Sequence, residues 1–204
     1  MARPVARRGE GRERVLGTAL RLFAEHGVGE TSLQMIAEEL GVTKAAVYFQ
    51  FRTKEEIVPA VLQPAFEQLA AFVPAAEALP TREARLDAAL TGLVDLVLTH
   101  RGVTAVLRGD RAAAQVVQSH QPLLDLIDRL GRLLVGPRPT QSDRVAVAMV
   151  GGGLMVIGTE PDLAALPTPT LRPHLLRHAR TLLGVPPAGI ATPRSRPTGR
   201  ASGA

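Results

Sequence analysis

Cysteine is absent from the 204-residue chain, and aromatic residues make up only 3% of it. Without cysteine there is no disulfide framework, no thiolate metal site and no cysteine nucleophile. This composition fits a reducing compartment, so we expect a cytoplasmic protein. No aromatic residue follows Phe72. Any cavity in the later part of the chain should therefore be aliphatic, which argues against an aromatic cage for cationic molecules.

Long hydrophobic runs are also missing. The longest apolar run, Val145 to Gly158, has 14 residues, fewer than the ~20 that a membrane-spanning helix needs. The basic N-terminal stretch lacks the apolar segment of a signal peptide. We therefore expect a soluble chain with no membrane partner.

Lysine is scarce, and its placement is informative. Among the 24 basic residues only Lys44 and Lys54 are lysines. The formal net charge is +5, and five arginines lie within the first 14 residues: Arg3, Arg7, Arg8, Arg12 and Arg14. Positive charge around a helix that contacts DNA bases attracts the phosphate groups, and this attraction dominates the affinity for nucleic acid. The alternative is an ordinary solvated surface, because Glu25, Glu30, Glu38 and Glu39 also lie in this part of the chain.

Residues 31–54, TSLQMIAEELGVTKAAVYFQFRTK, predict two short helices joined by a tight turn. Thr31 and Gln34 form a capping-box pattern that predicts the start of the first helix. Gly41 suits the left-handed residue that ends a helix. Thr43 is placed to cap a second helix that continues to about Gln50.

The second of these helices predicts a surface for a nucleic acid. Val47 should face inward, which leaves Lys44, Ala45 and Tyr48 outward. A short helix with small, basic and phenolic residues on its free face suits a DNA major groove, which is about 12 Å wide. Thr53 and Glu56 repeat the capping pattern, so a further helix begins at Lys54. The arrangement is a helix-turn-helix signature.

Residues 12–58 closely resemble the DNA-binding domain of the TetR family of bacterial transcriptional regulators. The resemblance is carried by ALRLFAEHG at 19–27, TSLQMIAEELGV at 31–42 and TKAAVYFQFRTKEE at 43–56. It implies a homodimer that binds a pseudo-palindromic double-stranded DNA operator. It further implies a ligand-responsive regulator, by family default a repressor, released by a small apolar or amphipathic inducer. The alternative is a ligand-independent or architectural DNA-binding protein, against which the large apolar second domain argues.

The resemblance also assigns DNA contacts to individual residues. Ser32 would contact a phosphate, and Gln34 a phosphate or a base. Lys44 and Ala45 are the base-edge candidates, because lysine suits guanine and a methyl group suits the thymine methyl. Tyr48 would bind the DNA backbone or, alternatively, pack against the preceding helix. The full set is Thr31, Ser32, Gln34, Thr43, Lys44, Ala45, Tyr48, Gln50 and Lys54.

The rest of the chain predicts an all-α protein of about nine to ten helices. A disordered arm (1–9) precedes the helix-turn-helix domain (10–57), a larger ligand-binding and dimerisation domain (58–184) and a disordered tail (185–204). The arm and the tail could each add DNA contacts or be inert. Phe23, Phe49 and Phe51 are expected in the core of the small domain.

Helical periodicity and capping residues place most of the remaining helices. Pro59 and Pro64 fall inside the helix that begins at Lys54, so we expect a bend there or two shorter segments, because an interior proline removes a hydrogen bond and clashes with the preceding turn. Such a kink could lie on a signalling route or be tolerated without a regulatory role. Residues 74–81 should be a connector. Further helices are expected over 81–100, 102–107, 111–119, 122–134, 142–157 and 170–183.

The last two predicted helices suggest a dimer surface. Three consecutive glycines at 151–153 destabilise a helix by about 1 kcal/mol each relative to alanine, so we expect another helix to approach closely there. The resemblance implies that these helices pair with a second copy of the chain; the alternative is that they close the monomer core. The candidate interface residues are Val150, Gly152, Leu154, Leu171, Leu175 and Leu182.

Polar residues that could orient a small ligand are His100, Arg108, Gln115, Gln118 and His120, although each could equally be a surface residue. His174 and His178 have a metal-compatible spacing, but no nearby carboxylate cluster completes a site. We therefore expect no cofactor, no metal, no catalytic residue and no enzymatic activity.

Overall fold

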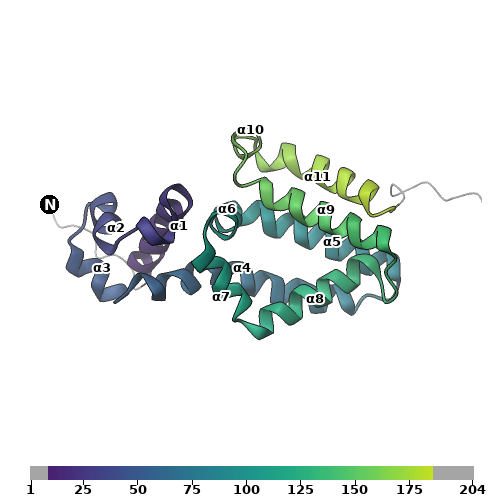
Figure 1. The fold of residues 1–204 in the computed structure, drawn as a ribbon, viewed down its shortest axis with the longest axis horizontal. Helices are drawn as coiled ribbons and strands as arrows, with labels where there is room; N and C mark the ends of the chain where they lie inside the picture. Colours follow the sequence, from purple (N-terminus) through teal and green to yellow (C-terminus); the bar gives the residue numbers. More distant parts are fainter. Residues whose placement is uncertain (1–8, 186–204) are drawn as a thin grey trace, which may run out of the picture.

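The computed structural model describes residues 9–185, and within that range it contains eleven helices and no strand (Figure 1). The all-α class is confirmed, with slightly more helices than the sequence predicted. The predicted disordered segments fall on residues 1–8 and 186–204, outside the described range, except for Gly9 and Val185. The helices are α1 Glu10–Glu30, α2 Leu33–Leu40, α3 Lys44–Gln50, α4 Lys54–Glu77, α5 Arg82–Thr99, α6 Arg101–Gly109, α7 Arg111–Gln118, α8 Gln121–Val135, α9 Gln141–Val156, α10 Pro161–Ala164 and α11 Thr168–Leu182.

Local capping signals fix most helix boundaries. The side chains of Thr43, Thr53, Thr81 and Asp110 each accept backbone hydrogen bonds at the start of a helix, as predicted. Gly41 ends α2 at φ 64°, in the left-handed region that favours glycine. Inside α1, Gly27 at φ 84° breaks the helical path, so the regular part of the helix ends before this glycine.

A bend or two shorter segments were predicted for α4, and the prediction of two segments is wrong. The prediction of a connector from residue 74 is wrong as well. Helix α4 is one continuous helix of 24 residues that contains Pro59, Pro64 and Pro74. All three prolines lie on its exposed side. The carbonyl groups that they leave without a helical partner can therefore be hydrated, which reduces the cost of an interior proline. Only residues 78–81 connect α4 to α5.

Two hydrophobic clusters share α4. The first cluster contains residues of α1, α2, α3 and α4, together with residues of α6 and α7. The second cluster contains residues of α4, α5, α8, α9 and α11. The predicted domain boundary at 57/58 therefore falls inside an unbroken helix, and α6 and α7 contribute Val103, Val106 and Ala113 to the first cluster. Figure 1 shows α4 running from the small helical group to the larger one.

Pairs of arginine and carboxylate side chains reinforce the larger helical group. Arg172 of α11 binds Asp95 of α5 through two hydrogen bonds of 2.6 and 2.9 Å. Arg180 and Asp87 form a second link between the same two helices. The planar guanidinium group fits a carboxylate bidentately, which sets geometry as well as energy. These pairs fix the orientation of α11 on α5.

Among the described helices, α4 alone is by itself long and apolar enough to cross a bilayer. Helices α5 and α6 reach that length and hydropathy only when the two are counted as one bent segment. The longest uninterrupted apolar run in the sequence does not reveal this segment, because polar residues are interspersed along α4. Eight residues of α4 are buried in the protein, as expected for a core helix.

Candidate nucleic-acid interface

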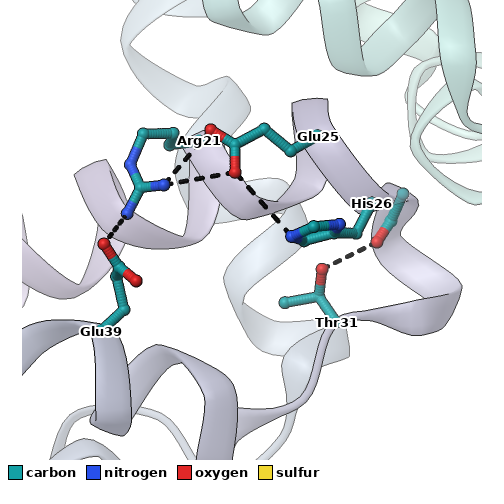
Figure 2. A network of polar contacts seen from close by, with 6 residues as sticks. Arg21, Glu25, His26, Thr31 and Glu39 are labelled. Atoms are coloured by element: carbon teal, nitrogen blue, oxygen red, sulfur yellow. Dashed lines mark hydrogen bonds and ion pairs between the residues drawn. The ribbon is translucent and has the colours of Figure 1, made fainter.

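The first helix of the motif begins one residue later than predicted. Ser32, with an extended backbone, is the N-cap of α2, and its oxygen accepts a hydrogen bond from Met35 N at 3.1 Å. Thr31 is only 1% exposed and donates its hydroxyl proton to the Gly27 carbonyl at 2.8 Å (Figure 2). The Gln34 amide bonds to Glu38 instead of capping the helix. The capping box of Thr31 and Gln34 was thus wrong, and the buried Thr31 has almost no exposed surface to offer to DNA.

Helix α3 presents the predicted face. Val47 is fully buried, whereas Lys44, Ala45 and Tyr48 are exposed. The Lys44 ammonium lies 5.5 Å from the centroid of the Tyr48 ring, a cation–π geometry. Tyr48 is 44% exposed, so it is not enclosed against α2. The side chain of Thr43 accepts from Ala46 N at 3.3 Å and holds the start of α3.

A shallow hollow of about 380 Å³ gathers several of the candidate residues. The starts of α2 and α4 open onto it, and helix N-termini attract anions because their N–H groups are unpaired and their dipole is positive. Thr43, Ala45 and Gln50 lie outside its lining. The candidates that line it are Thr31, Ser32, Gln34, Lys44, Tyr48 and Lys54, together with Arg52, which the sequence analysis did not select.

Lys54 has a structural role that the sequence did not reveal. Its ammonium group donates hydrogen bonds to the carbonyl oxygens of Gly29 at 2.6 Å, Val28 at 3.0 Å and Thr31 at 3.3 Å. It thereby ties the start of α4 to the turn between α1 and α2. A phosphate contact from Lys54 stays a prediction, and it would have to share an ammonium group that already has three partners.

Phe49 was predicted in the core but is 87% exposed, whereas Phe23 and Phe51 are buried as expected. Phe49 follows the buried Val47 by two residues, which places it about 200° around the helix, on the opposite face. This offset was the signal in the sequence that could have placed it. Phe51 is covered from outside by the Arg12 guanidinium, 4.8 Å from its ring centroid.

An ion-pair network sets the angle between α1 and α2 (Figure 2). The Arg21 guanidinium bonds Glu25 one turn further along α1 and reaches across to Glu39 of α2. Figure 2 shows the two carboxylates on either side of the guanidinium, with His26 against Glu25. The alternative of ordinary solvated charge does not describe Glu25 and Glu39, which both pair with Arg21.

The larger helical group contains a cavity of about 300 Å³ that is lined by residues of every helix from α4 to α9. Of the five predicted ligand residues only His100 lines it. Arg108, Gln115, Gln118 and His120 are exposed and lie outside the lining. His120 instead accepts from Leu123 N at the start of α8. The choice of these four was wrong for this cavity, because sequence spacing does not reveal which face of α6 and α7 turns inward. Thr104, a buried hydroxyl on α6, lines the cavity and was missed.

The predicted dimer residues divide between two faces. Val150, Leu154 and Leu171 are buried in the second hydrophobic cluster of the monomer, so they are not available to a partner. Gly152 is exposed, Leu175 is half-buried and Leu182 is 42% exposed. No group of this chain lies within 4 Å of a β-carbon placed on Gly151, Gly152 or Gly153. The expected close helix is therefore absent within the described part of the monomer.

Comparisons with known proteins agree with this geometry. Residues 15–61 match the family model described as bacterial regulatory proteins, tetR family. The HTH-type transcriptional regulator SrpR of Pseudomonas putida is 43% identical over 63 residues, which are 30% of each chain. The HTH-type transcriptional regulator AcrR of Shigella flexneri is 46% identical over 48 residues, or 24% of this chain and 22% of that one. The matched segments thus span less than a third of these relatives.

The solved structures extend the likeness of fold beyond this segment. The ketosteroid transcriptional regulator KstR2 of Mycobacterium tuberculosis superposes with a TM-score of 0.68 at 18% identity, covering 89% of this chain and 97% of that one. At this identity the likeness concerns the fold alone. The family model and the curated relatives cover the helix-turn-helix, and the fold comparison covers the helices that follow. Residues 15–61 therefore carry the helix-turn-helix domain of the TetR family of bacterial regulatory proteins, and the chain as a whole shares its fold with a regulator of known structure.

Proposed function

We propose that this chain is a DNA-binding transcriptional repressor that acts in the cytoplasm as a homodimer on a pseudo-palindromic operator. The observation that carries the proposal is the free face of α3. Its inner side is anchored by the buried Val47, and its outer side exposes Lys44, Ala45, Tyr48 and Phe49. A short helix anchored in this way fits a major groove.

The residues on and beside this face make two kinds of DNA contact, with base edges and with the backbone. Lys44 and Ala45, in the first turn of α3, read base edges, because recognition helices contact bases mainly through their N-terminal residues. Ser32 and Arg52, at the hollow beside α3, contact phosphates and fix the register. Phe49 has no hydrogen-bonding group, so its exposed ring packs against deoxyribose or a thymine methyl group.

The homodimer forms through the outward faces of α9 and α11. Exposed apolar or small residues recur along α9 at helical spacing: Val145 (58% exposed), Met149 (56%), Gly152 and Gly153. Leu182 extends the surface on α11. Gly152 and Gly153 are exposed and leave room for a close helix that this monomer does not supply, and a second copy related by two-fold symmetry supplies it.

The regulator responds to a small molecule bound in the cavity of about 300 Å³. Helix α6 contributes to the lining of this cavity and also buries Val103 and Val106 in the cluster that includes the helix-turn-helix. A ligand that favours one arrangement of α6 therefore changes the population of the arrangement that binds the operator.

Selection of bound sequences from random double-stranded DNA by the full-length protein tests this function. We expect an inverted repeat whose half-site centres are one helical turn, about 10 base pairs, or a multiple of it apart. Lys44→Ala should weaken binding to the selected site by about 1–3 kcal/mol and binding to random DNA much less. Arg138→Ala, which removes an exposed charge from the loop before α9, is the matched control and should leave both affinities unchanged.

The same experiment distinguishes the proposed repressor from a ligand-independent architectural DNA-binding protein. Such a protein would enrich no repeat, and its affinity would fall steeply with salt at every sequence. Equal losses for Lys44→Ala on selected and random DNA would reduce Lys44 to a phosphate contact.

A further inference from the structure

A second hollow, of about 350 Å³, lies in the larger helical group where the end of α4, the start of α5 and the end of α8 come together. We call it the arginine hollow, because the ionisable residues in its lining are Arg82, Arg85, Arg129, Arg132 and Glu77. We propose that this hollow binds a soluble small molecule through a phosphate or diphosphate group. Its lining shares no residue with the apolar cavity or with the hollow beside α3, so the proposal does not rest on the function proposed above.

The arginine hollow lies far from the helix-turn-helix. Helix α4 connects the two, since it begins at Lys54 beside the turn between α1 and α2 and ends at Glu77 in the hollow. A helix of 24 residues is about 36 Å long. Figure 1 shows α4 running away from α2 and α3 towards the larger helical group. An anion held in the hollow is therefore not a phosphate of the DNA that α3 contacts.

Arg129 is held in place by Glu77. Its Nε donates to Glu77 Oε1 at 3.0 Å and its Nη2 donates to Oε2, so one guanidinium group occupies both carboxylate oxygens. The hydrogen bond from Arg129 lowers the pKa of Glu77, and the charges of Arg132 and Arg85 lower it further. Glu77 therefore stays ionised at neutral pH and neutralises one of the four arginines.

Arg85 and Arg82 are positioned by contacts with the backbone. The Nε of Arg85 donates to the Leu79 carbonyl at 2.6 Å, and its two terminal nitrogens have no hydrogen-bond partner within residues 9–185. The Arg82 guanidinium packs on Gly136, a buried glycine at φ 86°, where a β-carbon would lie only 2.5 Å from Arg82 Nη1. Side chains that are already positioned lose less conformational entropy when a ligand binds.

Three of the arginine charges are not neutralised by an ion pair. Among the residues that the structure describes, no carboxylate oxygen lies within 4 Å of a side-chain nitrogen of Arg82, Arg85 or Arg132. The charge of Arg82 also acts on Asp143, but the Oδ2 atom of that carboxylate already accepts from the backbone N–H and the hydroxyl of Thr140. Positive charges gathered in one hollow repel one another, and a bound anion relieves this repulsion.

The arrangement of the arginines favours a phosphate over a carboxylate. Arg82 and Arg85 come from α5, whereas Arg129 and Arg132 come from α8. A planar carboxylate accepts one guanidinium fork, as Glu77 does. A phosphate group has three acceptor oxygens and carries about two charges at pH 7, so it accepts from several guanidinium groups at once. At about 30 Å³ per water-sized group, the hollow admits on the order of ten non-hydrogen atoms, enough for a diphosphate.

Inorganic pyrophosphate is the probe for this site, titrated by calorimetry into the full-length protein without DNA and at physiological salt. Malonate, which carries two carboxylates, represents the other class of anion. We expect saturable binding of pyrophosphate and about ten-fold weaker binding of malonate, because malonate offers fewer anionic oxygens to the guanidinium groups. A failure of pyrophosphate to bind saturably would overturn the proposal, as would equal affinities for the two anions.

Variants of the lining test the location of the site. Arg82→Gln and Arg132→Gln each remove one charge and should weaken pyrophosphate binding about ten-fold, the effect of one charge-assisted hydrogen bond. Both arginines are exposed, so the variants should melt like the unmodified chain. Arg138→Gln changes an exposed arginine outside the lining and should bind pyrophosphate unchanged. Unchanged binding in both lining variants, or an equal loss in Arg138→Gln, would overturn the proposal.

Two further measurements exclude other sources of the same chemistry. Arg52→Gln alters the hollow beside α3 and should leave pyrophosphate binding unchanged. A loss in this variant and not in Arg82→Gln would move the anion to the DNA-binding surface and overturn the proposal. In flotation with phosphatidylcholine vesicles that contain phosphatidate, the protein should stay unbound. Flotation that Arg132→Gln abolishes would replace the soluble ligand by a lipid headgroup and overturn it as well.

Discussion

The carboxylate of Asp110 accepts a hydrogen bond from the backbone N–H of Val28 at 2.7 Å, across 82 residues of sequence. Asp110 also ends α6 and caps α7 through bonds from Ala112 and Ala113. One side chain thus joins the corner between α6 and α7 to the turn that follows α1. Lys54 holds the carbonyl groups of that same turn from the other side. The helix-turn-helix is therefore positioned by contacts on both sides of residues 27–31.

Asp110→Asn should destabilise the fold by about 1–3 kcal/mol, because it removes a charge-assisted acceptor from several backbone donors. Burial alone would raise the pKa of Asp110, but backbone hydrogen bonds from α7 and from the 27–29 turn outweigh it and lower this pKa. Because the folded pKa is depressed, the stabilisation is present above the ordinary value of 3.8 and is lost as pH falls through the folded pKa.

Urea unfolding at pH 7 and at pH 3 measures this difference. The variant should lose stability mainly at pH 7. Asp128→Asn, at an exposed carboxylate of α8, is the control and should unfold like the unmodified chain at both pH values. Equal unfolding midpoints for the two variants at pH 7 would contradict the role of Asp110.

Met149→Arg should convert the proposed dimer into a monomer, because Met149 is 56% exposed at the centre of the apolar surface of α9 and a buried, unpaired charge is costly. Size-exclusion chromatography with light scattering measures the mass. Leu166→Arg changes a comparably exposed leucine (38%) outside α9 and α11 and should leave the mass unchanged. A Met149→Arg protein that remains dimeric would place the interface elsewhere.

Phe49→Ala should weaken operator binding in a gel-shift titration without lowering thermal stability, since the ring is 87% exposed and contributes little to the core. Phe51→Ala is the contrasting variant. Its ring is 4% exposed, so truncation should cost about 3–5 kcal/mol of stability. If Phe49→Ala binds the operator as the unmodified chain does, the exposed ring has no part in DNA contact.

His100→Gln should flatten the dependence of stability on pH. Burial lowers the pKa of His100 below its ordinary value of 6.5, so the unfolded chain binds a proton more readily than the folded one. The stabilisation is complete above pH 6.5 and declines as pH falls toward the folded pKa. Thermal melting at pH 7.5 and 5.5 should show a smaller loss for the variant. An identical loss in both proteins would mean that His100 titrates alike in the folded and unfolded chains.

Local signals predicted the helical motif well. Gly41, Thr43 and Thr53 act at helix ends as their residue types suggest, because capping depends on a few neighbouring atoms. Prediction failed where burial decides. Phe49 was assigned to the core from its apolar character, although its angular offset from Val47 places it in solvent.

The ligand and dimer residues show the same limit. Only His100 among five ligand candidates faces the cavity, since sequence spacing fixes which residues share a helix face and not which neighbour that face meets. Val150 and Leu154 were predicted at the dimer interface, but they face the monomer core because α9 packs there on the second hydrophobic cluster.

The sequence by itself determined the helical class, most helix boundaries and the helix-turn-helix motif, because periodicity, capping and an ordered motif are local properties of the chain. The tertiary structure decided which side chains are free to bind. It buried Thr31, occupied Lys54 with three carbonyl groups and paired His100 with Gln68. The Gly29 partner of Lys54 and the Gln68 partner of His100 lie 25 and 32 residues away in sequence, and their positions are set only when the helices pack.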